Sequence, residues 1–156
     1  MPVLLAPHQA PTLPELLQAA NLTGLDTSIV ESDKPMPRIQ GLGSLLSAGP
    51  TEISFLANPR LQGQLAQCRA AAVILTPEAW QSWSAAPPQF RVVLCSQPYL
   101  MYALLAQWFD RHRIQSLAKG VHPSAVIAAT AHVAPDAAIG PNCVIEDDVR
   151  IGAGTR

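Results

Sequence analysis

The residues best suited to hold a flat ring lie in one short segment, ISFLANPR, at positions 53–60. Phe55 offers an aromatic face for stacking, and the amide of Asn58 offers a hydrogen-bond donor beside an acceptor. Pro59 restricts Asn58 to extended backbone, which aims its side chain outward from a strand end. Two structural roles remain open: Phe55 as a core residue, and Asn58 as the N-cap of a helix that begins at Pro59.

The cysteines and histidines predict neither a metal site nor a nucleophile. The three cysteines are Cys68, Cys95 and Cys143. They lie far apart, their number is odd and no C-x-x-C pair occurs, which argues against a disulfide framework and a zinc ribbon. His122 and His132 fall at different positions of the repeat described below, so they form no column of ligands. We therefore expect no bound metal.

The composition predicts a folded, soluble chain. Hydrophobic residues make up 49% and charged residues 13%, which excludes a disordered protein. No apolar run approaches the roughly 20 residues of a membrane span. With a net charge of −1 and 5% aromatic residues, nothing favours nucleic acid as a partner. The amino-terminal segment lacks the basic residues of a secretory signal, so we expect a cytoplasmic location.

A strict six-residue period runs from Val121 to Arg156: VHPSAV, IAATAH, VAPDAA, IGPNCV, IEDDVR, IGAGTR. The first position always holds a β-branched aliphatic residue, and the fifth position a small or medium one. This period predicts the first coils of a parallel β-helix, a form that usually winds left-handed. Three units close one triangular coil, with the first-position side chains inside. Six units make only two coils and lack a polar cap, so we expect the chain to be part of a longer protein.

The residues before this repeat predict a small α/β domain. Thr12 and Glu15 form a capping box for a helix that runs to about Ala20. Strands are expected at 39–42, 53–56, 71–75 and 91–95, and helices at 59–68, from Pro77, and at 98–113. This alternation predicts a mostly parallel sheet with helices against it. The last helix should bury an apolar face made of Leu100, Met101, Leu104, Leu105, Trp108 and Phe109.

In that helix, Tyr99 and Tyr102 are expected to serve packing. The predicted domains are therefore an α/β domain at 1–113, a linker at 114–120, and the start of the β-helix at 121–156.

Four segments in this order resemble the amino-terminal part of the UDP-3-O-(3-hydroxyacyl)-glucosamine N-acyltransferases, a family of lipid A synthesis. They are ISFLANPR at 53–60, CRAAAVILTPE at 68–78, QPYLMYALLAQWFD at 97–110 and GVHPSAVI at 120–127. The resemblance implies a homotrimer of left-handed β-helices. It also implies transfer of a 3-hydroxyacyl group from acyl carrier protein, through its phosphopantetheine and without a further cofactor, to the 2-amino group of UDP-3-O-acyl-glucosamine.

The resemblance also implies roles for particular residues. Phe55 would stack on the uracil of the substrate, and Asn58 would form hydrogen bonds with the imide edge of that uracil. Arg60 would either face the diphosphate or be solvated. Leu61 stands where the family usually has a tyrosine as the second wall of the uracil site. The family's catalytic histidine lies on a later coil, beyond Arg156, so no catalytic residue is assigned and the 156 residues alone are expected to be inactive.

Two other functions are compatible with these features. One is another sugar-nucleotide acyltransferase built on the same repeat with a different acyl donor. The other is a non-catalytic binding or assembly module.

Overall fold

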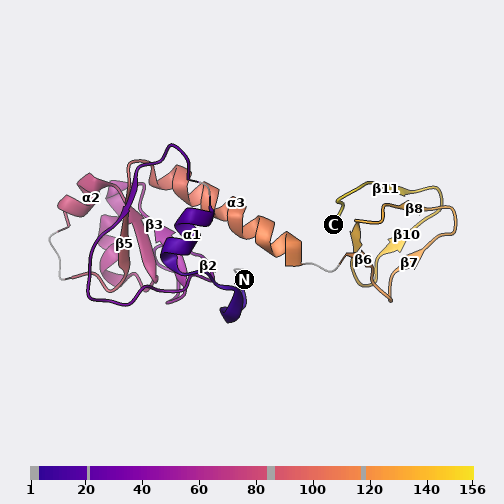
Figure 1. Cartoon of the computed structure of the whole chain (residues 1–156), viewed down its shortest axis with the longest axis horizontal. Coiled ribbons are helices and arrows are strands. Elements are labelled where there is room, and N and C mark those ends of the chain that lie inside the picture. The colour runs from indigo at the N-terminus through magenta and orange to yellow at the C-terminus, as the bar shows by residue number, and fades with distance from the viewer. Residues whose placement is uncertain (1–3, 21, 84–86, 117–118) are drawn as a thin grey trace. The chain divides into compact units, whose positions relative to one another are not determined.

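The computed structural model describes residues 4–20, 22–83, 87–116 and 119–156 (Figure 1). The chain divides into two compact units, Met1–Arg111 and His112–Arg156. The long helix α3, Pro98–Ser116, crosses this boundary, so the first three residues of the expected 114–120 linker are helical. Residues 117 and 118 of that linker lie outside the described residues. Within the described ranges, no helix is long and apolar enough to cross a membrane.

A five-stranded sheet forms the centre of the first unit, in the order β1-β5-β4-β3-β2. The strands are β1 Thr27–Ile29, β2 Gly41–Leu42, β3 Glu52–Phe55, β4 Ala72–Leu75 and β5 Arg91–Cys95. Strands β2, β3, β4 and β5 pair in parallel, and only β1 is antiparallel to its neighbour. The predicted α/β sheet is therefore present, and β1 is a strand that the sequence pattern did not predict. Its three residues, TSI, are too few to show a period.

Each face of this sheet has its own apolar core. Ile53, Ala72 and Val93 point to one face and pack with helices α1, Leu13–Ala19, and α3. Val73, Leu75 and Val92 point to the other face and pack with the 3-10 helix η2, Pro59–Gln67, and helix α2, Pro77–Gln81. Because side chains alternate along a strand, a strand covered on both faces must be apolar throughout, as β4 is.

Helix α1 begins where its sequence signal predicts. The Thr12 backbone N–H donates to Oε2 of Glu15 at 2.7 Å. This hydrogen bond to the backbone of Thr12 is the main reason that the pKa of Glu15 is lowered. Leu13 and Leu16 are then buried one turn apart, and they attach the helix to the sheet.

Two helix predictions need correction in detail. The helix expected at 59–68 is a 3-10 helix in which only Leu65 is buried, and Gly63 lies at its middle. A glycine disfavours α-helix by about 1 kcal/mol, and a single buried side chain offers little tertiary contact to offset that. In α3, Leu100 is 42% exposed, so the buried face consists of Met101, Leu105, Trp108 and Phe109.

The second unit consists of six two-residue strands that pair in parallel. They are β6 Gly120–Val121, β7 Val126–Ile127, β8 His132–Val133, β9 Ala138–Ile139, β10 Val144–Ile145 and β11 Arg150–Ile151. Strand β6 pairs with β9, β7 with β10, and β8 with β11. Each residue therefore lies beside the one three hexapeptides later in the chain. Among the first-position residues Ile139 is buried, but Val121 is 48% exposed and the other four are half-buried, so the predicted inward position is only partly present. Val126 and Val144 at the sixth position are exposed.

Hydroxyl groups join turns that lie three hexapeptides apart, here called corners. Asn142 and Asp148, at the fourth position of their hexapeptides, have positive φ angles of 58° and 59°. Asparagine and aspartate tolerate this left-handed conformation better than most residues. The Asn142 N–H donates to Oγ of Ser124 at 3.1 Å, and the Asp148 N–H donates to Oγ1 of Thr130 at 2.9 Å. Thr130 also donates to Oδ1 of Asp147 at 2.9 Å.

The Thr130→Val substitution keeps the side-chain shape and removes this corner hydroxyl. An intramolecular hydrogen bond contributes about 1 kcal/mol, so the Asp148 amide should exchange with deuterium about fivefold faster in the variant. Thr155→Val is the matched control in the same unit, and it should leave the Asp148 exchange rate unchanged. Equal rates in wild type and Thr130→Val would show that the hydroxyl does not hold the corner.

Candidate functional site

The carboxyl ends of the parallel strands bring the predicted site residues to one edge of the sheet. Strand β3 ends at Phe55, β5 ends at Cys95, and α3 begins soon after at Pro98. Parallel strands place their carboxyl ends together, and ligands of open α/β sheets bind outside that edge. Phe55, the loop to Asn58 and the first turn of α3 therefore form the candidate site.

Phe55 is the centre of a three-ring aromatic cluster. Its ring centroid lies 4.4 Å from that of Tyr102, at an interplanar angle of 33°. The Tyr99 ring lies 6.0 Å away in an edge-on arrangement at 63°. Phe55 is half-buried and packs against the core that α1 and α3 share, whereas Tyr99 is 70% exposed. Phe55 therefore combines partial core packing with a position at the surface, so neither alternative from the sequence describes it completely.

The phenol of Tyr102 is held in its neutral form. Burial is the main cause that raises the pKa of Tyr102, and the negative charge of Glu52 adds to it. A neutral phenol keeps its O–H donor at physiological pH. Tyr102 can thus offer a hydrogen bond beside the ring of Phe55.

Asn58 is the N-cap of η2, which is one of the two roles that the sequence left open. Its backbone is extended, at φ −105° and ψ 112°, as the following proline requires. Its Oδ1 accepts a hydrogen bond from the Arg60 N–H at 3.1 Å. The side chain is exposed, and its amide nitrogen has no hydrogen-bond partner within the described ranges. The capping role therefore leaves the donor group of the amide available to a ligand.

Arg60 and Leu61 both lie in the first turn of η2 and are exposed. The Arg60 guanidinium has no partner in the part of the chain that the structure describes, and Leu61 is 40% exposed. The structure thus places Phe55 at the strand end and the other three predicted residues in the cap and first turn of the next helix.

The sequence predicts packing for both Tyr99 and Tyr102 and gives no link between them and Phe55. Tyr99 is instead 70% exposed. Tyr102 does pack, but it packs on Phe55 at the site edge rather than in the deep core. The available signal was their spacing, since residues three apart share one side of a helix, and this helix follows directly after a strand.

The cysteines and histidines have structural surroundings: Cys95, at the end of β5, is buried and accepts a hydrogen bond from the Gln97 N–H at 3.4 Å. Among the described residues, no three histidine, cysteine, aspartate or glutamate side chains gather as metal ligands would. Burial raises the pKa of the Cys68 thiol, which disfavours the reactive thiolate. His122 Nδ1 lies 2.8 Å from Oγ of Ser124, and His132 Nδ1 lies 3.0 Å from the carbonyl oxygen of Thr130. Both imidazoles therefore belong to the corners of the repeat.

Comparison with known proteins points to the same family as the sequence resemblance. A family model described as UDP-3-O-(3-hydroxymyristoyl) glucosamine N-acyltransferase matches residues 36–108. A UDP-3-O-acylglucosamine N-acyltransferase of Bordetella petrii is 53% identical over 97% of this chain and 39% of its own length. The protein of that name from Bordetella bronchiseptica is 49% identical over 92% of the chain and 40% of its own length. One from Pseudomonas aeruginosa is 42% identical over 71% of the chain and 29% of its own length.

The chain thus spans about 40% or less of the length of these curated relatives.

The raised pKa of Tyr102 can be measured directly, because the chain has only two tyrosines. In a Tyr99→Phe variant, the tyrosinate absorbance should appear with a midpoint above 10, and in concentrated urea it should return to about 10. Since the folded pKa is raised, the contribution of the neutral phenol to stability is complete below pH 10 and is lost as the pH rises through the folded value. A midpoint of 10 in the folded protein would contradict the burial of this phenol.

Proposed function

Because the chain belongs to the family of UDP-3-O-acylglucosamine N-acyltransferases, we propose that the whole protein N-acylates a UDP-3-O-acylglucosamine in lipid A synthesis. The observation that carries this proposal is the 53% identity over 97% of the chain. In the reaction, the 2-amino nitrogen attacks the thioester carbonyl of a 3-hydroxyacyl group on acyl carrier protein. The new amide C–N bond replaces the C–S bond, and the phosphopantetheine thiol leaves with a proton.

This chemistry requires a neutral base within hydrogen-bond reach of the amine and N–H donors directed at the developing oxyanion. None of Phe55, Asn58, Arg60 and Leu61 is a neutral base, and the N–H donors of Asn58 and Arg60 are assigned to the nucleotide below. We propose that the first unit binds the nucleotide and that the general base belongs to the part of the relatives' length that this chain does not match.

Within the first unit, we propose that the uracil stacks on Phe55 and pairs with Asn58. The exposed amide nitrogen of Asn58 can donate to a uracil carbonyl, and its Oδ1 keeps a second lone pair for the uracil N–H. The Arg60 guanidinium, in the first turn of η2 and without a partner among the described residues, suits the diphosphate, since arginine binds phosphate through two parallel N–H groups. Leu61 supplies an apolar wall without an aromatic face.

We further propose that the second unit begins a left-handed parallel β-helix and that the whole protein is a homotrimer. The pairing of residues three hexapeptides apart supports the coil, as do the burial of Ile139 and the positive φ angles of Asn142 and Asp148. The handedness and the trimer come from the family resemblance.

The nucleotide site can be tested with uridine and UDP, followed by amide chemical shifts of residues 54–61. Both ligands should shift these amides in the wild type. Phe55→Leu keeps an apolar side chain and loses the ring; because base stacking contributes about 1–3 kcal/mol, binding should weaken at least about fivefold. Leu61→Tyr should strengthen binding by adding a second ring.

Leu46→Tyr is the matched control, because it adds a tyrosine at another exposed leucine. It should leave the affinity for uridine unchanged. If uridine and UDP shift no amides in the segment 54–61 at millimolar concentration, the proposal of a nucleotide site is wrong, and a non-catalytic binding or assembly module is favoured.

The activity can be tested separately with a protein of the relatives' full length that begins with these 156 residues. It should transfer 3-hydroxyacyl groups from acyl carrier protein to UDP-3-O-acylglucosamine, whereas the 156 residues alone should show no turnover. Turnover by the 156 residues alone would refute the assignment of the base outside them. A full-length protein that used only a different acyl donor or sugar would favour another acyltransferase.

A further inference from the structure

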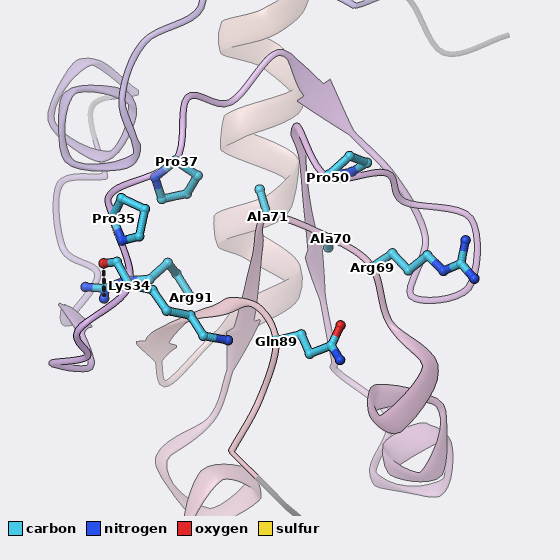
Figure 2. Close-up of a pocket in the computed structure, with 9 residues that line it drawn as sticks. All are labelled: Lys34, Pro35, Pro37, Pro50, Arg69, Ala70, Ala71, Gln89 and Arg91. Atoms are coloured by element: carbon cyan, nitrogen blue, oxygen red, sulfur yellow. Dashed lines mark hydrogen bonds between the residues drawn. The ribbon is translucent and has the colours of Figure 1, made fainter.

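A cavity of about 550 Å³ opens at the amino edge of the sheet, the edge opposite Phe55 (Figure 2). It lies where the loops enter β4 and β5, and a segment before β2 and one proline before β3 complete it. Its lining residues are Lys34, Pro35, Pro37, Pro50, Arg69, Ala70, Ala71, Gln89 and Arg91. Three of these carry a positive charge and none carries a negative charge.

Arg91 is the buried member of this cationic group. It is 5% exposed, and its guanidinium Nη1 donates to the carbonyl oxygens of Ser32 at 2.8 Å and Lys34 at 3.1 Å. Both acceptors are neutral, and the buried Nε has no hydrogen-bond partner. Burying a cation without a compensating anion is costly, so this arrangement favours an anion from outside the chain.

The one buried carboxylate in the described part of the chain, that of Glu52, does not compensate Arg91. The strand register aligns Arg91 with Ala72 and Ala72 with Ile53, so these residues share one face of the sheet. Glu52 precedes Ile53 and therefore points to the other face. There its Oε2 accepts a hydrogen bond from the Gly49 N–H at 2.7 Å.

Lys34 and Arg69 carry the other two charges. Lys34 Nζ donates to the carbonyl oxygen of Pro88, which is again a neutral acceptor. Arg69 is exposed at the rim of the cavity, and its side chain has no partner within the described ranges. In Figure 2 the Lys34 ammonium points into the lower part of the cavity, and the Gln89 amide points away from it, toward the side of Arg69. The Arg91 guanidinium lies at the Lys34 carbonyl on one side, and the Arg69 side chain extends outward on the opposite side.

The rest of the lining is apolar. The rings of Pro35, Pro37 and Pro50 and the methyl groups of Ala70 and Ala71 provide rigid hydrocarbon surface above and behind the charged groups (Figure 2). The volume falls within the range of small-molecule sites, about 300–1,000 Å³, and exceeds what a bare inorganic anion would fill.

We propose that this cavity binds a small organic phosphate. The phosphate group lies beside the Lys34 ammonium, Arg91 and Arg69 add positive charge from the inner wall and the rim, and the organic part contacts the proline rings. The site is separate from the proposed uridine site, because strands of four or five residues hold the two edges of the sheet about 15 Å apart.

The first experiment titrates the chain with inorganic phosphate, pyrophosphate and glucose 1-phosphate at constant ionic strength, set with chloride. Each should shift the amides of residues 34, 69–71, 89 and 91, with glucose 1-phosphate binding more tightly than inorganic phosphate. Uridine, which has no phosphate, should shift none of these amides. Equal affinity for glucose 1-phosphate and inorganic phosphate would overturn the role of the proline rings.

Variants then test the charges. Lys34→Gln and Arg69→Gln should each weaken pyrophosphate binding at least fivefold, because each removes one positive charge from the lining of the cavity. Arg91→Lys keeps the buried charge, so it should bind pyrophosphate if it remains folded. Arg111→Gln removes an exposed arginine whose Nε donates only to Gln107, and it should bind like the wild type.

Equal weakening in Arg111→Gln and in the cavity variants would mean that net charge alone governs binding, and it would overturn the site. Shifts confined to amides away from the cavity would overturn it as well.

Discussion

The parallel pairing of β3, β4 and β5 is the constraint on which the first unit depends. Ile53 pairs with Ala72 and Ala72 with Arg91, so the three strands begin and end nearly level. Their common direction defines two edges of different chemistry. At the carboxyl edge Phe55 meets Tyr102 and Tyr99, and at the amino edge Lys34 and Arg91 meet proline rings. Apolar residues cover both faces of β4, and the charged residues of the neighbouring strands, Glu52 and Arg91, stand at the first positions of β3 and β5.

Much of this fold was predictable because its strongest signals are local. The apolar runs of β4 and β5 predict two buried strands, and the six-residue period from Val121 predicts the parallel pairing of strands three hexapeptides apart. The edge strand β1 gave no such signal, because its three residues take their conformation from β5. The exposure of Leu100 was missed for a related reason: apolar type does not tell how far a helix is rotated against the sheet.

In the candidate site, too, the residue types could be predicted from the sequence, whereas the tertiary contacts could not. The types of Phe55 and Asn58 indicated a ring and an amide at a strand end, and both are found there. The sequence offered the core role of Phe55 and the N-cap role of Asn58 only as alternatives to a site role, and it did not show that one residue can fill both. Phe55 packs on Tyr102, and Asn58 caps η2 through one oxygen while its nitrogen stays open. The approach of Tyr102 depends on the docking of α3, and the isolation of Arg91 from Glu52 depends on strand register. Both are tertiary facts about residues distant in sequence.

The corner hydroxyls of the second unit restrict how such a chain can change in length. Ser124 and Thr130 each accept a hydrogen bond from an amide three hexapeptides later in the chain, which is one turn of the proposed coil. Loss or gain of a single hexapeptide would rotate every later corner onto a neighbouring side and give each hydroxyl the wrong partner. Only whole turns preserve the match, so viable relatives should differ by complete coils, and shorter insertions should bulge outward at a corner and leave the stack intact.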